Sequence, residues 1–234
     1  MSLVNSLSLV LAPPHPAGRP FIYGGAAVAL VGGLIFGAWL FWLGAAFTAF
    51  CLYFFRDPKR VHPPVRDLVL APADGKVVLV GPAIPPVELE MGAAPRWRVA
   101  IFLSVMDVHV NRSPVQGRIS RISYRPGKFL DASVDKASEE NERNALRFDL
   151  PDGRQLGCVQ IAGLIARRIV CNVNEGDQLL AGERFGLIRF GSRTDVYLPE
   201  GVKPTVLVGQ TMIGGETILA DLAVPLGVAL GGTV

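Results

Sequence analysis

Charged side chains are missing from one long stretch of this sequence. No Asp, Glu, Lys or Arg occurs from Phe21 to Phe55, a run of about 35 residues between Arg19 and Arg56. One perpendicular membrane-spanning helix needs about 20 apolar residues, so the run is long for one span and short for two full ones. Because Gly32-Gly33 interrupts it, we expect a helical hairpin broken at that pair. One long tilted span and a buried core helix are the alternatives.

The segments on either side of the apolar run are polar. Residues 1–20 form a Pro-rich leader, and an apolar stretch of this length after such a leader argues against a cleaved signal peptide. Residues 56–66 contain four cationic side chains and one acid among several prolines. A basic, Pro-rich linker beside the apolar run favours the cytoplasmic face of an inner membrane and contact with anionic lipids. Residues 67–234 are left for one further domain.

Cysteine is also scarce, because the chain has only Cys51, Cys158 and Cys171. An odd number without a Cys-x-x-Cys spacing argues against a disulfide framework and offers no metal-binding pair. We therefore expect a reducing, cytoplasmic setting and no metal. The net charge is only +3. Without an Arg-rich helix, a zinc-finger spacing or an aromatic RNA-binding signature, the sequence argues against a nucleic-acid partner.

Short apolar runs separated by Gly, Pro and Asp follow the linker. Their length and β-branched content predict strands at 68–71, 76–80, 97–105, 117–124, 145–150 and 154–161. Pro151-Asp152-Gly153 predicts a hairpin turn between the last two. The polar stretch 130–144 is interpreted as a loop, and 164–173 fits a short helix or a strand equally well. The predicted fold is mainly β, a sandwich or barrel, with apolar membrane helices at its N-terminus.

The pattern V-x-x-G-x-x-x-x-x-G-E occurs twice, starting at Val173 and at Val206. Each copy has the composition of strand, turn and strand, so we expect two similar β units that pack together. They resemble the half-barrels of biotinyl and lipoyl carrier domains. A carrier needs a lysine on a tight hairpin tip, and Lys203, between Val202 and Pro204, lacks that context. The repeat therefore predicts architecture rather than a carrier function.

Three residues could supply an acid, a base and a nucleophile. Asp74 lies in an Asp-Gly turn, His109 is the only histidine after residue 66, and Ser192 follows Gly191. Each alone has an ordinary structural interpretation, but together they have the composition of a catalytic triad. A serine hydrolase is one hypothesis, although the Gly-x-Ser-x-Gly elbow is missing. A serine that cleaves its own chain is another, and a non-enzymatic β-sandwich module tethered to a membrane is a third.

Five motifs in a fixed order carry a resemblance to a known family. They are Ala-Pro-Ala-Asp-Gly-Lys-Val at 71–77, Phe-Leu-Ser-x-x-Asp-Val-His-Val-Asn-Arg at 102–112, Tyr-Arg-Pro-Gly-Lys-Phe at 124–129, Glu-Asn-Glu-Arg-Asn at 140–144 and Phe-Gly-Ser at 190–192. In order and spacing the chain resembles phosphatidylserine decarboxylase in its short bacterial form. The resemblance covers most of residues 50–200.

The resemblance implies a pyruvoyl enzyme that makes its own prosthetic group and uses neither a metal nor pyridoxal phosphate. Self-cleavage at Gly191-Ser192 would give a β chain, 1–191, and an α chain, 192–234, which stay together as a heterodimer. Asp74 would orient His109, which would deprotonate Ser192. The pyruvoyl group made from Ser192 would form a Schiff base with the amine of phosphatidylserine and yield phosphatidylethanolamine and CO2. The enzyme would work on an anionic inner membrane, from its cytoplasmic face, with further homo-oligomers possible.

One departure from the family pattern concerns the base. Longer members carry His-x-x-His where this chain has His109-Val110-Asn111-Arg112, so Arg112 stands in the place of the second histidine. Either His109 serves both self-cleavage and decarboxylation, or another group takes one of these steps. For the lipid phosphate the matching motifs offer four cations, each of which could equally be a solvated surface charge: Arg112, Arg125, Lys128 and Arg143.

Overall fold

The computed structural model describes residues 12–64, 67–127, 141–163, 168–190 and 192–223. The chain divides into two compact units, Met1–Lys59 and Arg60–Val234. The boundary therefore lies inside the segment 56–66 that the sequence predicts as a single linker. Lys128 and Gly191, and most of the predicted loop 130–144, lie outside the described residues.

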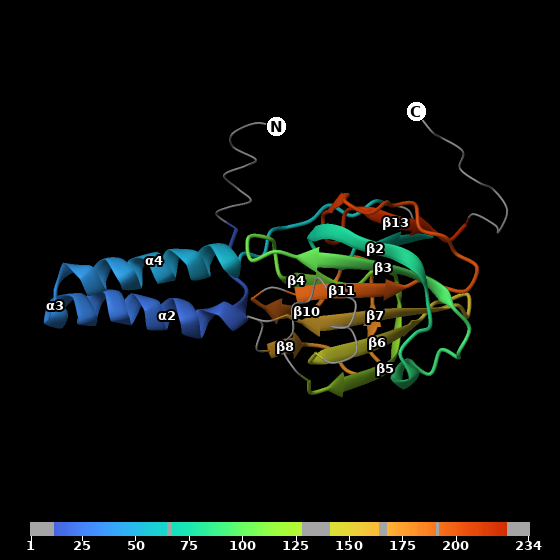
Figure 1. Ribbon diagram of the computed structural model, residues 1–234, viewed down its shortest axis with the longest axis horizontal. Coiled ribbons are helices and arrows are strands. Elements are labelled where there is room, and N and C mark those ends of the chain that lie inside the picture. The colour runs from blue at the N-terminus through green and yellow to red at the C-terminus, as the bar shows by residue number, and fades with distance from the viewer. Residues whose placement is uncertain (1–11, 65–66, 128–140, 164–167, 191, 224–234) are drawn as a thin grey trace, which may run out of the picture. The chain divides into compact units, whose positions relative to one another are not determined.

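The N-terminal unit is a helical hairpin (Figure 1). Its first arm runs through η1 (Pro16–Gly18), α2 (Arg19–Ala27), a π-helical turn η2 (Val28–Gly32) and α3 (Gly33–Phe36), and its second arm is α4 (Ala38–Phe54). Among the described residues, the helix Pro16–Phe36 alone is long and apolar enough to cross a membrane, while α4 is shorter. Large apolar side chains on both arms are exposed, including Leu34 at 88% and Trp42 at 68%.

The turn of the hairpin lies at Gly37 rather than at the predicted Gly32-Gly33. Gly37 has φ +96°, a conformation that glycine adopts without the penalty of a side chain. Gly32 and Gly33 instead lie against the other arm, where an added Cβ would come within 2.6 Å of Leu40 and 2.8 Å of Phe41. These two glycines therefore serve close helix packing, which a glycine pair in the sequence does not distinguish from a break.

The base of the hairpin is closed by backbone hydrogen bonds. His15 N donates to Phe55 O at 2.7 Å, and Asp57 N donates to Pro13 O at 3.0 Å. Arg56 lies over the Tyr53 ring at 3.9 Å from its centroid and donates Nη1 to the Tyr53 carbonyl. The first residues of the predicted linker thus belong to the hairpin unit.

The second unit is built on an eight-stranded antiparallel sheet in the order β12-β2-β3-β11-β7-β6-β5-β9 (Figure 1). Its strands are β2 (Gly75–Ala83), β3 (Arg96–Leu103), β5 (Gly117–Arg125), β6 (Arg143–Asp149), β7 (Gln155–Ala162), β9 (Gln178–Leu179), β11 (Ser192–Tyr197) and β12 (Thr211–Met212). The short helix η3 (Val87–Leu89) lies between β2 and β3 in the chain. All pairings in this sheet are antiparallel, so the end of each strand lies beside the beginning of its neighbour.

Two smaller sheets complete the sandwich. One has the order β4 (Val110–Arg112), β10 (Arg184–Arg189), β8 (Arg168–Cys171), and the other pairs β1 (Leu68–Leu70) with β13 (Ile218–Asp221). The main apolar core joins the three sheets: Ile101 and Val196 come from the large sheet, Phe185 from β10 and Leu219 from β13. The predicted mainly β fold is confirmed. β8 shows that 164–173 contains a strand, and β6 begins two residues before the predicted Ala145.

The two copies of the repeat supply opposite edge strands of the large sheet, β9 and β12. Their turns are built alike, because Gly176 N donates to Ile119 O at 2.7 Å and Gly209 N donates to Val77 O at 2.8 Å. Each copy forms one short strand rather than the predicted pair. The copies approach each other at their Gly-Glu ends, where Gly182 and Gly215 both lie against the His62 ring.

Candidate active site

Ser192 is the first residue of β11 and lies between Leu103 of β3 and Ala162 of β7. Its side chain is 0% exposed, and its Oγ has no hydrogen-bond partner among the described residues. Leaving a buried hydroxyl unpaired costs about 1–3 kcal/mol, and such groups often have a chemical role. The position therefore differs from an ordinary turn serine, which would be solvated.

Backbone strain lies two residues before Ser192. Phe190 has φ +60°, and the left-handed conformation costs a residue with a side chain roughly 1–2 kcal/mol. Residues held in such conformations cluster at active sites, where the surrounding structure maintains them. The strained residue and the unpaired hydroxyl flank the predicted scissile bond at Gly191, which itself lies outside the described residues.

His109 is 1% exposed and lies beside the strand that leads to Ser192. Its carbonyl accepts a hydrogen bond from Ile188 N of β10 at 3.2 Å, and β10 ends at Arg189. His109 Nδ1 lies 2.9 Å from the Asp107 carbonyl. Because a carbonyl can only accept, Nδ1 carries the proton, and Nε2 is the nitrogen that takes up a proton when the ring acts as a base.

Asp74 precedes β2 and is held from two sides. Its Oδ2 accepts a hydrogen bond from Arg60 Nη2 at 2.6 Å, and its Oδ1 accepts one from Gly214 N at 2.8 Å. Burial raises the pKa of the Asp74 carboxyl, Arg60 opposes that rise, and the charge of Asp107 adds to it. In this structure the Asp107 carbonyl contacts His109 Nδ1, and the contacts of Asp74 are with Arg60 and Gly214.

The fold brings the three predicted residues to one end of the sheet without joining them in a hydrogen-bonded chain. Asp74 stands before β2, His109 follows the turn after β3, and Ser192 opens β11. These strands are neighbours in the order β2-β3-β11. Neighbouring strands lie about 4.8 Å apart, so the strand that follows Asp74 and the strand that begins at Ser192 are separated by two such spacings, about 10 Å.

A strip of buried polar side chains continues from Ser192 along the inner face of the sheet. Asn144 Nδ2 donates to Gln160 Oε1 at 2.9 Å, and Gln160 Nε2 donates to Asn111 Oδ1 at 2.8 Å. Gln160 is the register partner of Thr194, whose Oγ1 is buried without a partner among the described residues. Sequence reasoning missed this strip, although a glutamine within the apolar strand 154–161 was a visible signal.

On the outer face of β11, a buried ion pair follows Ser192 directly. Arg193 and Asp195 are 1% and 0% exposed, and two hydrogen bonds join them, Nε to Oδ1 at 2.6 Å and Nη2 to Oδ2 at 2.8 Å. Arg98 Nη1 lies 3.7 Å from Asp195 Oδ2. Alternate residues of a strand point to opposite faces, so this pair anchors β11 while Ser192 and Thr194 face inward.

The predicted phosphate ligands do not gather around Ser192. Arg112 is 4% exposed and donates Nη1 to Gly182 O at 3.1 Å, which favours a structural role. Arg143 contacts Glu88 at 2.5 Å and is the register partner of Arg125. Arg143 also pairs with Ile161 of β7, and the next residue of that strand, Ala162, pairs with Ser192. The pleat therefore points Arg125 and Arg143 to the face opposite Ser192.

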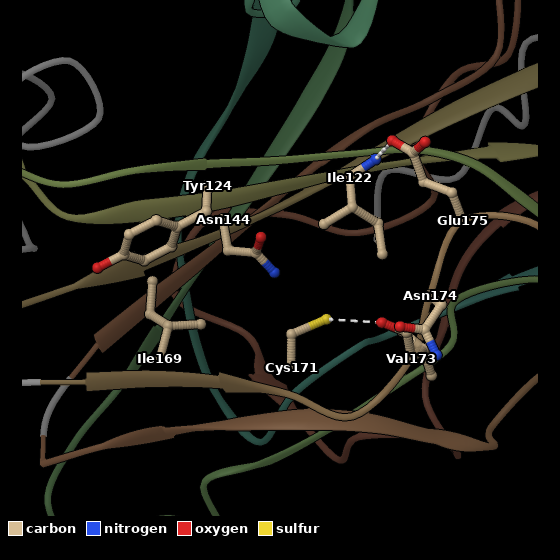
Figure 2. Close-up of a pocket in the computed structure, with 8 residues that line it drawn as sticks. All are labelled: Ile122, Tyr124, Asn144, Ile169, Cys171, Val173, Asn174 and Glu175. Carbon is tan, nitrogen blue, oxygen red and sulfur yellow. Dashed lines mark hydrogen bonds between the residues drawn. The ribbon is translucent and has the colours of Figure 1, made fainter.

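A cavity of about 410 Å³ opens between the inner face of β5 and β6 and the strand β8 (Figure 2). It is lined by Ile122, Tyr124, Asn144, Ile169, Cys171, Val173, Asn174 and Glu175. Asn144 begins the polar strip, and Ile169 packs against Ala162, the register partner of Ser192. Two strand spacings, about 10 Å, separate β6 from β11. The volume suits a ligand-binding cavity.

The buried serine, the histidine beside the preceding strand and the nearby cavity define the class of protein, an enzyme built on an antiparallel β-sandwich. Within the described part of the chain, no group of three His, Cys, Asp or Glu side chains is placed to hold a metal ion. The sequence model of the phosphatidylserine decarboxylase family matches residues 47–220. The chain therefore belongs to the phosphatidylserine decarboxylase family.

Proteins called phosphatidylserine decarboxylase proenzyme are similar to the chain over nearly its whole length. The one from Granulibacter bethesdensis is 68% identical over 222 residues, which cover 95% of this chain and 91% of that protein. The one from Gluconobacter oxydans is 63% identical, covering 95% of this chain and 100% of that protein. The one from Cereibacter sphaeroides is 56% identical, covering 94% of each.

Proposed function

We propose that this protein decarboxylates phosphatidylserine to phosphatidylethanolamine and CO2 after cleaving itself between Gly191 and Ser192. The observation that carries the proposal is the buried Ser192 hydroxyl, which has no partner among the described residues and follows the strained Phe190. Family membership supplies the substrate, and the relatives' name, proenzyme, is consistent with cleavage.

In the proposed cleavage, Ser192 Oγ attacks the Gly191 carbonyl, and the peptide bond becomes an ester with a free amine on Ser192. His109, through Nε2, is the candidate to take the hydroxyl proton. Loss of the Ser192 Cα proton then eliminates the Gly191 carboxylate and ends the β chain at 191. The enamine left at position 192 hydrolyses to a keto group and releases ammonia.

The surroundings of Ser192 suit the resulting pyruvoyl group. Ser192 and Thr194 are fully buried, and two potential donors nearby, Thr194 Oγ1 and Asn111 Nδ2, have no partner among the described residues. When present, the group supplies a carbonyl that accepts the electron pair left by CO2. We propose that His109 moves protons at this position. The cavity between β6 and β8 is proposed to hold part of the lipid, with Asn144 and Gln160 orienting its polar end.

We also propose that the hairpin of α2 and α4 inserts into an anionic inner membrane, with the β-domain on the cytoplasmic face. The exposed apolar side chains of the hairpin and the cationic segment 56–66 support this placement. Of the predicted phosphate ligands among the described residues, Arg125 is the most exposed and remains a candidate. Lys128 remains one as well.

The first prediction concerns chain masses. Mass spectrometry of the denatured wild-type protein is expected to show two chains divided at 191/192, the smaller one blocked at its N-terminus. Ser192→Ala is expected to stay intact and to produce no phosphatidylethanolamine, because the nucleophile is gone. A single intact wild-type chain that decarboxylates lipid would contradict the proposal. An intact chain that a fluorophosphonate probe labels at Ser192 would instead indicate a serine hydrolase.

A further inference from the structure

Three consecutive residues, Arg60-Val61-His62, attach the beginning of the second unit to the β-sandwich; we call them the docking segment. Arg60 Nη2 contacts Asp74 Oδ2 at 2.6 Å, and the side chains are only 6% and 17% exposed. Val61 N donates to Glu216 Oε1 at 3.0 Å. His62 Nδ1 lies 2.8 Å from the Gly215 carbonyl. Each residue of the segment therefore makes a polar contact with the domain.

The docking segment occupies the place where the two copies of the repeat meet. A Cβ at Gly182 would overlap the His62 ring, and one at Gly215 would lie 3.4 Å from it. Both glycines have positive φ, +80° and +78°, so a side chain at either would be strained as well as crowded. The matching glycines of the repeat thus leave room for an imidazole between them, and Arg60, which contacts Asp74, lies two residues before that imidazole.

Arg60 changes the chemistry available to Asp74. Burial alone favours the neutral acid and raises the pKa of the Asp74 carboxyl, and the nearby charge of Asp107 acts in the same direction. Arg60 and the Gly214 N–H favour the carboxylate. Arg60 and Asp107 are the charged groups that act on Asp74 from neighbouring elements. Removing Arg60 would leave Asp107 to reinforce burial, and the acid would hold its proton to higher pH.

We propose that Arg60 is a positioning residue for self-cleavage, which holds the Asp74 carboxylate in place through their buried ion pair and keeps it ionised. The segment that follows the membrane hairpin thereby completes the processing site. This inference rests on the proposed cleavage at Ser192. It assigns to Arg60 a role that neither the triad composition nor the motif at 71–77 contains, since Arg60 lies outside both.

The test follows cleavage of full-length chains over time, synthesised without cells in the presence of anionic vesicles, between about pH 5 and pH 9. Arg60→Gln is expected to slow cleavage about 10-fold or more on the acid side and to move the acid limb of the rate profile to higher pH, since one pKa unit equals a tenfold change in the ionised fraction. Arg60→Lys, which keeps the charge, is expected to restore most of the rate.

Two further variants separate the proposed role from a structural one. His62→Ala loosens the docking segment without removing the charge beside Asp74, so its cleavage is expected to keep the wild-type pH profile. In an Asp74→Asn background, Arg60→Gln is expected to have no further effect on rate, because the two residues act as a unit. Circular dichroism and thermal unfolding of each purified chain check that it folds.

The outcomes distinguish this inference from the proposal on which it rests. If the wild-type chain is cut at 191/192 and folded Arg60→Gln is cut at the same rate with the same pH profile, the role of Arg60 is overturned and the proposed function stands. The role would also be overturned if Arg60→Gln slowed cleavage equally at all pH values, or if its effect on the cleavage rate were the same in the Asp74→Asn background as in the wild-type chain. If the wild-type chain is never cut, both proposals fail.

Discussion

Buried hydroxyl groups in this domain differ in whether they are hydrogen-bonded, and this distinguishes Ser192 and Thr194 from Ser113. Ser113 Oγ is buried and donates to Val115 O at 2.7 Å, so its role is structural. Ser192 Oγ and Thr194 Oγ1 are buried on the same face of β11 without partners among the described residues. No described residue makes a hydrogen bond to the Ser192 hydroxyl, so no such bond within the described part of the chain has to break when it attacks.

At the residue scale, a prediction concerns the ion pair behind Ser192. Asp195→Asn leaves the buried guanidinium of Arg193 without its carboxylate, and breaking a buried pair costs about 3–5 kcal/mol. We expect the Tm to fall by roughly 10 °C, measured by thermal unfolding in detergent. Asp152→Asn is the matched control, because Asp152 and Arg154 form an exposed pair whose side chains are 46% and 33% exposed. Such pairs contribute about 0–1 kcal/mol.

A Tm of Asp195→Asn within about 2 °C of wild type would contradict this prediction, since that shift corresponds to less than about 1 kcal/mol for a chain of this size. Arg98, whose Nη1 lies 3.7 Å from Asp195 Oδ2, would also lose this charged contact in the variant. The exposed pair at Asp152 shows why the short N–O distance alone, 2.5 Å there, is a poor guide to stability.

At the scale of elements, β8 forms one side of the cavity. It pairs with β10 and faces β6 and β5 across the cavity, so that Ile169 and Cys171 line one side and Asn144 and Tyr124 the other (Figure 2). Asn144 donates to Gln160 in the strip that leads to Thr194 and Ser192. The buried polar strip therefore connects the lining of the cavity with the strand that begins at Ser192.

Cys171 allows the cavity to be tested chemically. It is half-buried, whereas Cys158 and Cys51 are 0% exposed, and burial raises the pKa of the Cys158 thiol and keeps it unreactive. A bulky maleimide is expected to modify Cys171 in the processed enzyme and to slow decarboxylation by at least about tenfold, because it fills the cavity. Short-chain phosphatidylserine should protect the thiol from modification.

The control is Cys171→Ser, which should keep its activity and become insensitive to the reagent. Decarboxylation is measured as CO2 release from labelled lipid, and the site of modification by peptide mass. If fully modified enzyme retains its rate while Cys171→Ser behaves like wild type, the cavity is not where the lipid binds. The proposed cleavage at Ser192 would be unaffected by that result.

At the scale of the whole molecule, the proposed cleavage would cut the chain without dividing the sandwich. β11 is one of the two central strands of the large sheet and pairs along its six residues with both β3 and β7. β12 pairs with β2, and β13 pairs with β1. The 192–234 chain would therefore contribute strands to two sheets formed mainly by the other chain.

We accordingly expect the two chains to remain together after cleavage as a heterodimer held by hydrogen bonds and the shared core. Size exclusion in mild detergent should show both chains in one peak, and they should separate only in denaturant. Loss of the small chain on dilution in mild detergent would contradict this prediction. The uncut Ser192→Ala protein is the control for the size of the intact sandwich.

Much of this organisation could be predicted from local sequence. The length of the apolar run marks the helical hairpin, short apolar runs rich in β-branched residues mark the strands, and the Pro-Asp-Gly turn marks the β6–β7 hairpin. These signals depend on neighbouring residues. Ser192, His109 and Asp74 were found through motifs in which each residue keeps a fixed spacing from its neighbours. Even the position of the hairpin turn, at Gly37 instead of Gly32-Gly33, was missed only by a few residues.

The partners of these residues were decided by tertiary structure alone. Residues far apart in the chain become neighbours through strand order, register and curl of the sheet, none of which a local pattern specifies. Hence Asp74 meets Arg60, His62 lies between Gly182 and Gly215, and Arg143 points away from Ser192. The sequence by itself determined which residues carry reactive groups. The pairing of strands determined which of those groups are buried, charged and close to one another.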